Sequence, residues 1–301
     1  MISVVQLGTV DYGTGLRLQQ QLVALRKEEK IGDVLLLLEH SPVITLGRNA
    51  KATNIIASPE FLAQRGVEVF ECNRGGDVTF HGPGQIVGYP IFDLRGFAAP
   101  DGKRKTLGAV DFVRRLEEVL IRACADFSIP TKRVPGLTGV WTDLKGRNFS
   151  RADSGKDNEA ASAAEVCREA KLAAIGVHIS RFVTSHGFAL NVNTDLNYFD
   201  LIIPCGITAK PVTSMQQELG KPLDLNAVAE SFSSARNDKT REGPLWGSVQ
   251  TPVSPGTRFV GMAKSAQVRM RTSSRRRTNS TAPRVLRLPS GAACPRRSKM
   301  G

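Results

Sequence analysis

Cys205 is the strongest candidate nucleophile in this sequence, because Pro204 and Gly206 force a turn around it. A cysteine on a turn can be exposed, whereas a cysteine on the apolar face of a helix is buried and unreactive. An ordinary thiol has a pKa of about 8.5, so a base or cation must help to remove its proton. Lys171 could provide that help, although taken singly a cysteine is more often a small buried hydrophobe and a lysine a solvated charge.

A histidine offers a competing base. His186 lies in Ser185-His-Gly187 and, with Asp195, could complete a Cys-His-Asp triad around Cys205, which would make the protein a thiol hydrolase. Because neither Lys171 nor His186 adjoins Cys205 in the sequence, both arrangements stay open at this point.

A glycine-rich segment is the candidate binding loop. The run Arg74-Gly-Gly-Asp-Val-Thr-Phe-His-Gly-Pro-Gly-Gln85 contains four glycines, which let a backbone approach a ligand closely. Arg74 could hold a carboxylate or phosphate, and His81 could contact a substrate or hold the loop by a hydrogen bond. His40 and His178 are interpreted as structural. No Cys or His pair has the spacing of a zinc site, so no metal is expected.

The charge distribution separates a nearly neutral body from a basic tail. The formal net charge is +13, but residues 251–301 hold 12 Lys/Arg and no Asp/Glu, so residues 1–250 carry 29 basic against 28 acidic groups. We therefore predict a catalytic domain over residues 1–236 and a disordered tail over 237–301, too poor in large apolar residues to fold alone. The tail lacks interleaved aromatics, so specific nucleic-acid binding is not expected.

The cysteines and the apolar runs indicate the compartment. Five cysteines without paired spacing argue against a disulfide framework and for reducing surroundings. The N-terminus lacks the pattern of a secretory signal, and the longest apolar run, Val34 to Leu38, is too short to span a bilayer. A cytoplasmic protein without a membrane partner is expected.

Hydrophobic periodicity predicts a mixed succession of helices and strands. Strands are expected over about 34–38, 43–46, 67–71, 86–94, 139–142, 172–179 and 182–192, the last two as a hairpin or as neighbours. Helices are expected over about 13–29, after the cap Ser58 to about Gly66, over 107–127 and from Asp224, with ordered structure ending near Arg236. The apolar stripe of the longest helix comprises Val110, Val113, Leu116, Leu120, Cys124 and Phe127, so Cys124 is expected in the core.

Six ordered motifs of this sequence resemble those of the lipoyl(octanoyl) transferases. They are Arg74-Gly-Gly-Asp-Val-Thr-Phe-His-Gly-Pro-Gly-Gln85, Thr138-Gly-Val-Trp141, Lys171-Leu-Ala-Ala-Ile-Gly176, Ser185-His-Gly-Phe-Ala-Leu-Asn191, Pro204-Cys-Gly206 and Val212-Thr-Ser-Met215. The resemblance extends to about Phe232 and is interrupted at about 147–170, where a polar segment looks like an insertion. It implies a single α/β (mixed α+β) domain with a mixed β-sheet flanked by helices, as in biotin and lipoate protein ligases.

The resemblance also implies roles for individual residues. Cys205 matches the cysteine that carries the acyl group, and Lys171 matches the lysine of a Cys-Lys dyad. The positions that match substrate contacts are Arg74, Gly75, Gly76, Asp77, Val78, Thr79, Phe80, His81, Ala174, Ile175, Gly176, Gly187, Phe188 and Ala189. These are expectations carried over from the family's motifs.

The implied reaction is transfer of an octanoyl or lipoyl group from acyl carrier protein to a lysine of a lipoyl domain. The acceptors would be the lipoyl domains of 2-oxoacid dehydrogenases and the glycine cleavage H protein. Because transfer from a thioester to an amine is downhill, no cofactor is expected. The alternatives are an ATP-dependent lipoate-protein ligase of the same fold, which would not need Cys205, and the thiol hydrolase that would use His186.

Overall fold

The computed structural model describes residues 2–99, 104, 106–144, 168–203, 210–234 and 249–253. The strands are β1 (Ile2–Val10), β2 (Asp33–His40), β3 (Val43–Leu46), β4 (Glu68–Glu71), β5 (Val78–His81), β6 (Gln85–Ile91), β7 (Lys132–Val134), β8 (Leu137–Leu144), β9 (Arg168–Ser180), β10 (Val183–Asn191) and β11 (Val249–Val253). The α-helices are α1 (Tyr12–Lys27), α2 (Pro59–Gln64), α3 (Ala109–Asp126), α4 (Met215–Leu219) and α5 (Leu225–Ser234). Short 3₁₀ helices are η1 (Ala52–Asn54), η2 (Leu94–Gly96) and η3 (Leu196–Leu201).

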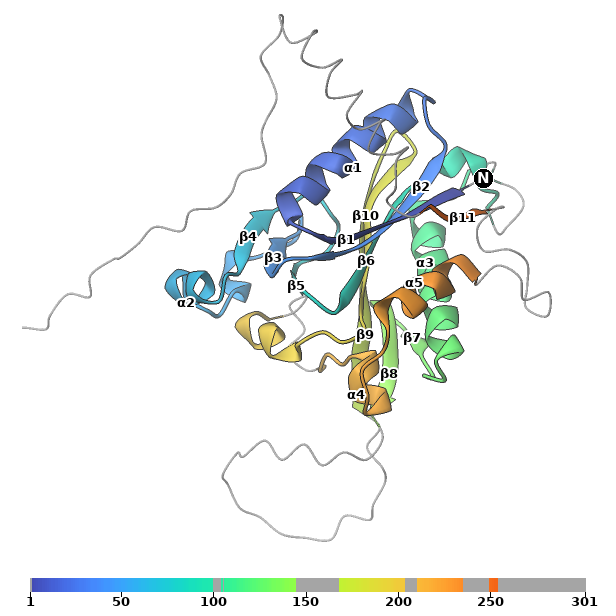
Figure 1. Cartoon of the computed structure of the whole chain (residues 1–301). Coiled ribbons are helices and arrows are strands. Elements are labelled where there is room, and N and C mark those ends of the chain that lie inside the picture. Colours follow the sequence, from blue (N-terminus) through green and yellow to red (C-terminus); the bar gives the residue numbers. More distant parts are fainter. Residues whose placement is uncertain are drawn as a thin grey trace, which may run out of the picture.

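The described strands form two sheets (Figure 1). The larger has eight strands in the order β11-β1-β2-β6-β10-β9-β8-β7, and the smaller has three in the order β4-β3-β5. In the larger sheet β1 runs parallel to β2 and β11, whereas the remaining pairs are antiparallel. The expected mixed sheet flanked by helices is therefore confirmed, and β9 and β10 form the expected hairpin.

The run of apolar residues in β2 is buried because the larger sheet is covered on both faces. Side chains alternate along a strand, so Leu35 and Leu37 face the cluster beneath α3 and α5, while Leu36 and Leu38 face the cluster beneath α1. An apolar residue at every position is the pattern of a strand with two buried faces.

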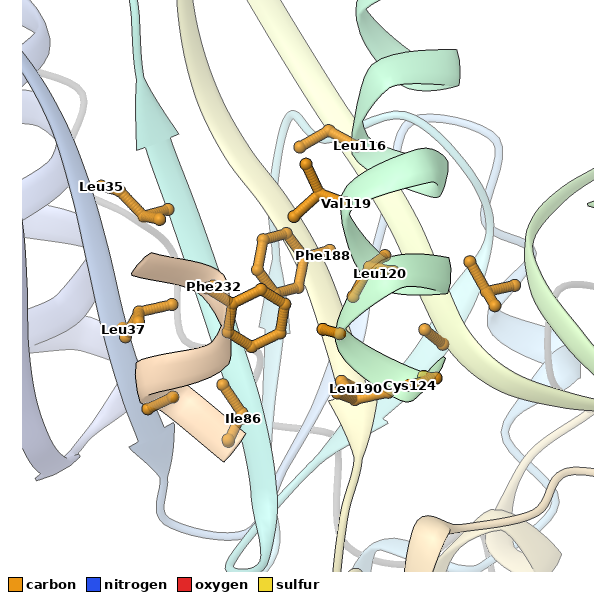
Figure 2. Packing of buried hydrophobic residues seen from close by; sticks show 14 of the residues in the cluster. Leu35, Leu37, Ile86, Leu116, Val119, Leu120, Cys124, Phe188, Leu190 and Phe232 are labelled. Carbon is orange, nitrogen blue, oxygen red and sulfur yellow. The ribbon is translucent and has the colours of Figure 1, made fainter. Parts of the chain in front are cut away.

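Helix α3 supplies much of the first cluster (Figure 2). Val119 and Leu120 lie beside Phe188 of β10, and Cys124 lies beside Leu190 of the same strand and is fully buried, as expected. Burial raises the pKa of the Cys124 thiol to about 12, which keeps this thiol protonated and unreactive.

The predicted stripe of α3 began at the wrong residue. Val110 is 71% exposed, and Phe112 is fully buried in its place. The two residues are about 200° apart around the helix, so they point in opposite directions. The stripe that packs on the sheet follows Phe112 and Leu116 instead.

Two alanine variants on α3 should separate its buried face from its exposed face. Leu120→Ala is expected to lower the free energy of unfolding by about 2–5 kcal/mol, because it removes buried methyl groups and leaves a cavity. Val110→Ala is the matched control, with an expected change within about 0.5 kcal/mol. Urea denaturation measures both, and equal effects would contradict this packing.

Other predicted elements differ mainly at their ends. The Ser58 hydroxyl accepts a hydrogen bond from the Phe61 N–H, as expected for the N-cap of α2. Strand β6 ends at Ile91, before the predicted limit of Leu94, because the Asp93 carboxylate accepts from the Arg95 N–H and begins η2. None of the helices in the described ranges is long and apolar enough to cross a bilayer.

The C-terminal boundary is also different. Strand β11 pairs in parallel with β1, so the expectation that ordered structure ends near Arg236 is wrong. The remainder of the predicted tail lies outside the described residues. Of the predicted insertion at 147–170, residues 168–170 belong to β9 and the others lie outside the described residues.

Candidate functional site

A cavity of about 340 Å³ lies where strands of both sheets meet the turn between β7 and β8. It is lined by Tyr12, Asn49, Arg74, Gly75, Gly76, Asp77, Thr79, His81, Val87, Tyr89, Gly136, Leu137, Thr138, Lys171, Ala174, Ile175, Gly176, His186, Gly187, Phe188 and Ala189. Its volume is within the range of small-molecule sites, roughly 300–1,000 Å³. The glycine-rich loop, β9 and β10 thus converge on one space.

All the predicted substrate-contacting residues except Val78 and Phe80 line this cavity. Both exceptions lie on β5, where alternation places Thr79 and His81 on the cavity side. The Val78 and Phe80 side chains point to the opposite side, into the cluster beneath α2, and Phe80 stacks on Tyr198 with ring centroids 4.6 Å apart. The prediction treated the motif as one unit and missed this alternation.

A β-bulge turns Lys171 toward the cavity. Trp141 of β8 is paired with Lys171 and the adjacent Val140 with Ala173, so Leu172 is an extra residue without a partner. Consequently Leu172 and Ala173 both face the core beneath α3. Because these two consecutive residues share one face, Lys171 and Ala174 share the other, and both line the cavity.

The surroundings of Lys171 hold its side chain over an aromatic ring. The Nζ atom lies 4.7 Å from the ring centroid of Trp141, a cation–π arrangement, and Nζ of Lys210 lies 5.6 Å from the same centroid. The backbone N–H of Lys171 donates to the Pro211 carbonyl, and its carbonyl accepts from the Thr213 N–H. The chain that follows Cys205 is therefore attached to β9 at Lys171.

Cys205 itself lies in 204–209, outside the described residues. Immediately before this segment, the Ile203 N–H donates to the Asn54 carbonyl at 2.7 Å. The Asn54 side chain in turn donates to the Asp77 carboxylate at 2.7 Å, which ties the approach to Cys205 to the glycine-rich loop. The pairing of Cys205 with Lys171 stays a prediction.

The glycine-rich loop packs against β9 at a distance that only glycine permits. The Gly75 N–H donates to the Val177 carbonyl at 3.0 Å. A Cβ atom on Gly176 would lie 2.6 Å from the Gly75 carbonyl oxygen, which is too close for any real contact. The backbone of the loop therefore forms a wall of the cavity directly beside Ile175 and Gly176.

Gly176→Ala should move this wall. We expect kcat/KM to fall by roughly tenfold to 100-fold, because a displacement near 1 Å of a positioning element can have such an effect. Gly96→Ala is the control, since a Cβ atom there meets nothing within 4 Å. Steady-state kinetics test the pair, and equal activity of both variants would contradict the close packing.

Arg74 holds the loop by its guanidinium. Only 8% of the residue is exposed, and each of its three nitrogens is engaged. Nη2 donates to the carbonyls of Thr45 at 2.8 Å and Asp77 at 2.6 Å, Nη1 donates to the Gly75 carbonyl, and Nε donates to the Thr45 hydroxyl. The sequence suggested that Arg74 could hold a carboxylate or phosphate, whereas these contacts give it a structural role in the loop.

Histidines and tyrosines form the inner end of the cavity, and the histidines are uncharged. Burial lowers the pKa of His81 to about 3 and that of His186 to about 3. His40 lies behind them, with its pKa lowered by burial to about 4 and its Nε2 2.5 Å from the Tyr89 hydroxyl oxygen. Burial also raises the pKa of Tyr12 and Tyr89, so these phenols stay neutral.

His186 has a partner other than the one the hydrolase interpretation needs. Its Nε2 lies 2.7 Å from the Asn73 side-chain oxygen. Asp195 instead accepts from the Asn197 N–H at the start of η3. The five steps along the strand from His186 to Asn191 span about 16 Å. Thr194, next to Asp195, is bonded to the Gly84 carbonyl at the Asn191 end of this strand, so Asp195 lies away from the imidazole. The predicted His186–Asp195 pair is therefore wrong.

Some cavity residues had no sequence signal. Tyr12 is the first residue of helix α1, and Tyr89 belongs to a largely apolar strand, so neither differs in pattern from a core residue. His81 has the loop-holding hydrogen bond considered for it, because its Nδ1 lies 2.7 Å from the Gln85 side-chain oxygen. It also lines the cavity, and its contact with a substrate stays a prediction. In the part of the chain that the structure describes, no group of three His, Cys, Asp or Glu residues could hold a metal ion.

Comparison with known proteins identifies the family. Residues 11–236 match the lipoyl protein ligase A/B catalytic domain. The chain belongs to this family. An octanoyltransferase of Koribacter versatilis is 58% identical over 82% of this chain and 87% of its own length. An octanoyltransferase of Acidobacterium capsulatum is 56% identical over 73% of this chain and 81% of its own length.

A solved structure supports the fold independently. The bipartite lipoate protein ligase of Thermoplasma acidophilum, described with its E2 lipoyl domain, has a TM-score of 0.56 at 11% identity, over 88% of this chain and 91% of its own. At this identity the likeness shows the fold alone. The relatives of high sequence identity establish the class of activity, and this protein is an acyltransferase.

Proposed function

We propose that this protein transfers an octanoyl or lipoyl group from acyl carrier protein to a lysine of a lipoyl domain, through a thioester on Cys205. The observation that carries the proposal is the placement of Lys171 by a β-bulge on a cavity walled by the glycine-rich loop. The octanoyltransferase relatives supply the identity of the acyl group.

The cavity suits an alkyl thioester in shape and charge. Val87, Ile175 and Phe188 provide apolar contacts, while the buried histidines remain neutral and Arg74 is occupied by the loop. An acyl chain placed there would lose contact with water without leaving a buried charge unpaired.

The first half-reaction forms the acyl-enzyme. Lys171 accepts the Cys205 thiol proton, and the thiolate attacks the carbonyl carbon of the octanoyl thioester. The resulting oxyanion needs hydrogen-bond donors, for which backbone N–H groups of the glycine-rich loop are candidates. The C–S bond to the carrier then breaks, and the departing pantetheine thiolate takes the proton from Lys171.

The second half-reaction moves the acyl group to its acceptor. The neutral amine of a lipoyl-domain lysine attacks the thioester carbonyl, Lys171 removes a proton from the amine, and the Cys205 thiolate leaves and is reprotonated. An amide replaces a thioester, so the step is downhill without ATP. Lipoyl domains of 2-oxoacid dehydrogenases and the glycine cleavage H protein are the proposed acceptors, and the reducing cytoplasm would keep Cys205 a free thiol.

Intact-mass analysis after incubation with octanoyl-acyl carrier protein, without ATP, tests the mechanism. The unmodified enzyme should carry one octanoyl group, whereas Cys205→Ser should carry none and Cys72→Ser should behave as the unmodified enzyme. Lys171→Ala should form the adduct roughly 100-fold more slowly or worse, because it lacks the base. Lys30→Ala, an exposed lysine, is its control.

The same experiment separates the rival functions. Transfer by Cys205→Ser only when octanoate and ATP are supplied would favour a lipoate-protein ligase and contradict the acyl-cysteine. A thiol hydrolase would release octanoate without a lipoyl-domain acceptor and would depend on His186 more than on Lys171. The hydrogen bond between His186 and Asn73 argues against the thiol hydrolase, which would need His186 to act as the base for Cys205.

A further inference from the structure

Glu117 is a fully buried carboxylate on the opposite side of the larger sheet from the cavity. It lies on the apolar face of α3 between Leu116 and Leu120, and its exposed fraction is 0%. Its Oε1 accepts from the Gly139 N–H at 3.1 Å, and its Oε2 accepts from Arg114 at 2.7 Å and Arg133 at 3.1 Å. A carboxylate is costly to bury unless such donors compensate it, so its position is closely specified.

Gly139 connects this carboxylate to Lys171. Its φ of +123° is a conformation that residues with a Cβ atom rarely adopt. A Cβ atom at this position would lie 2.5 Å from the Ala173 carbonyl oxygen and 3.7 Å from Cε of Lys171. The space beside Gly139 is thus bounded by the bulge and by the Lys171 side chain, and a larger residue there would meet both.

The same carboxylate holds the hairpin that surrounds Lys171. Arg133 lies on β7 and Gly139 on β8, so Glu117 binds both strands of the β7–β8 hairpin to α3. The turn of this hairpin lines the cavity, and Trp141, two residues beyond Gly139, carries the ring beneath Lys171. Displacement of β8 would therefore move the Trp141 ring and change the space in which Nζ of Lys171 lies.

We propose that Glu117 is a positioning residue for Lys171, acting through its hydrogen bond to the Gly139 N–H. The proposal rests on the proposed function, because it assigns the effect of Glu117 to the base Lys171. The hydrogen bond to Gly139 depends on the length of the Glu117 side chain, whereas the contacts with Arg114 and Arg133 depend on its negative charge. The two requirements can be changed separately.

Two conservative variants separate reach from charge. Glu117→Gln keeps a side-chain oxygen within reach of Gly139 but loses the charge, and its rate of acyl-enzyme formation should stay within about threefold of the unmodified rate. Glu117→Asp keeps the charge but is one methylene shorter, and its rate should fall on the order of tenfold or more. Single-turnover rates with saturating octanoyl-acyl carrier protein, normalised to folded protein, measure both.

A merely structural role gives the opposite order. If the ion pairs matter most, Glu117→Gln is the slower variant. Arg133→Met, which removes the ion pairs of Arg133 with Glu117 and Glu118 and leaves the Gly139 bond, should then reduce the rate at least as much. Either result overturns the proposal. Amide hydrogen exchange supplies a second readout, because the Gly139 N–H should stay protected in Glu117→Gln and lose protection in Glu117→Asp.

A double-mutant cycle identifies the target. In the Lys171→Ala background, Glu117→Asp should slow acylation by less than about twofold further, because its route of action is already removed. Additive effects would overturn the proposal while leaving the role of Lys171 intact. An unchanged rate for Lys171→Ala alone would instead reject the proposed base and this inference together. The two failures are therefore distinguishable.

Discussion

Acidification from pH 7 to pH 5 is expected to lower the free energy of unfolding by about 5 kcal/mol, chiefly through three buried histidines. Burial holds the folded pKa of His40 at about 4 and those of His81 and His186 at about 3, below the ordinary value of 6.5. The unfolded chain takes up these protons first, so acid favours unfolding. The stability is fully present above about pH 6.5 and is lost progressively as the pH falls toward 3–4.

The magnitude makes this a large effect for an ordinary domain. Each such histidine can contribute up to about 1.4 kcal/mol per pH unit in this window, and a typical domain has only about 5–15 kcal/mol in total. Carboxylates act in a lower window. Hydrogen bonding to Arg95 lowers the pKa of Asp93, so the stability that Asp93 contributes is lost only below its ordinary pKa of about 3.8.

Urea denaturation at pH 7, 6 and 5 measures the slope. His40→Gln removes one titrating group. Whatever its effect on stability at pH 7, it should reduce the slope of the free energy of unfolding between pH 6 and 5 by about 1 kcal/mol per pH unit. His178→Gln is the control, because His178 is only partly buried and its pKa is lowered less. A slope that is unchanged by His40→Gln would contradict the assignment.

The hydrophobic pattern predicted the layers of this fold because burial dominates at those positions. The run Val34 to Leu38 indicated a buried strand, and the stripe through Leu120 and Cys124 indicated a helix with one buried face, as the structure shows. Val110 was misplaced because the predicted stripe reached it from Leu116 by two steps of three residues, which leave it about 120° from Leu116 around the helix. Hydrophobic periodicity therefore predicted which segments form helices and strands more reliably than which side of each element is buried.

The candidate site was predictable only through its motifs. Lys171 and Ala174 are three residues apart, so an unbroken strand would place them on opposite faces, and nothing in the sequence marks Leu172 as a bulge. Glu117 resembles any exposed helical glutamate, since its burial depends on Arg133 and Gly139, which are distant in the sequence. Such positions depend on tertiary contacts that local patterns do not encode.

Arg74→Ala is expected to have the largest effect of any substitution in the glycine-rich loop. It would remove the charged donor from the buried Thr45 carbonyl and from the partly buried carbonyls of Gly75 and Asp77, of which the Asp77 carbonyl keeps a bond from the Gly47 N–H. Each buried acceptor that is left unsatisfied costs about 1–3 kcal/mol. We expect the free energy of unfolding to fall by about 3 kcal/mol or more and kcat/KM by about 100-fold or more. Arg17→Ala, an exposed arginine bonded to Thr14, is the matched control.

Arg74→Lys distinguishes the two roles that an arginine at this position could have. A lysine retains the charge but cannot donate in the planar fork that reaches the Thr45 and Asp77 carbonyls together, so a loop-holding role makes it nearly as damaging as alanine. A role in binding the phosphate of the carrier's prosthetic group would instead be partly preserved by lysine. Kinetics with octanoyl-acyl carrier protein and with octanoyl-pantetheine, which lacks the phosphate, decide the matter. Because the observed contacts occupy every nitrogen of Arg74, both donors should lose kcat/KM to the same extent, and a loss confined to the phosphorylated donor would contradict the loop-holding role.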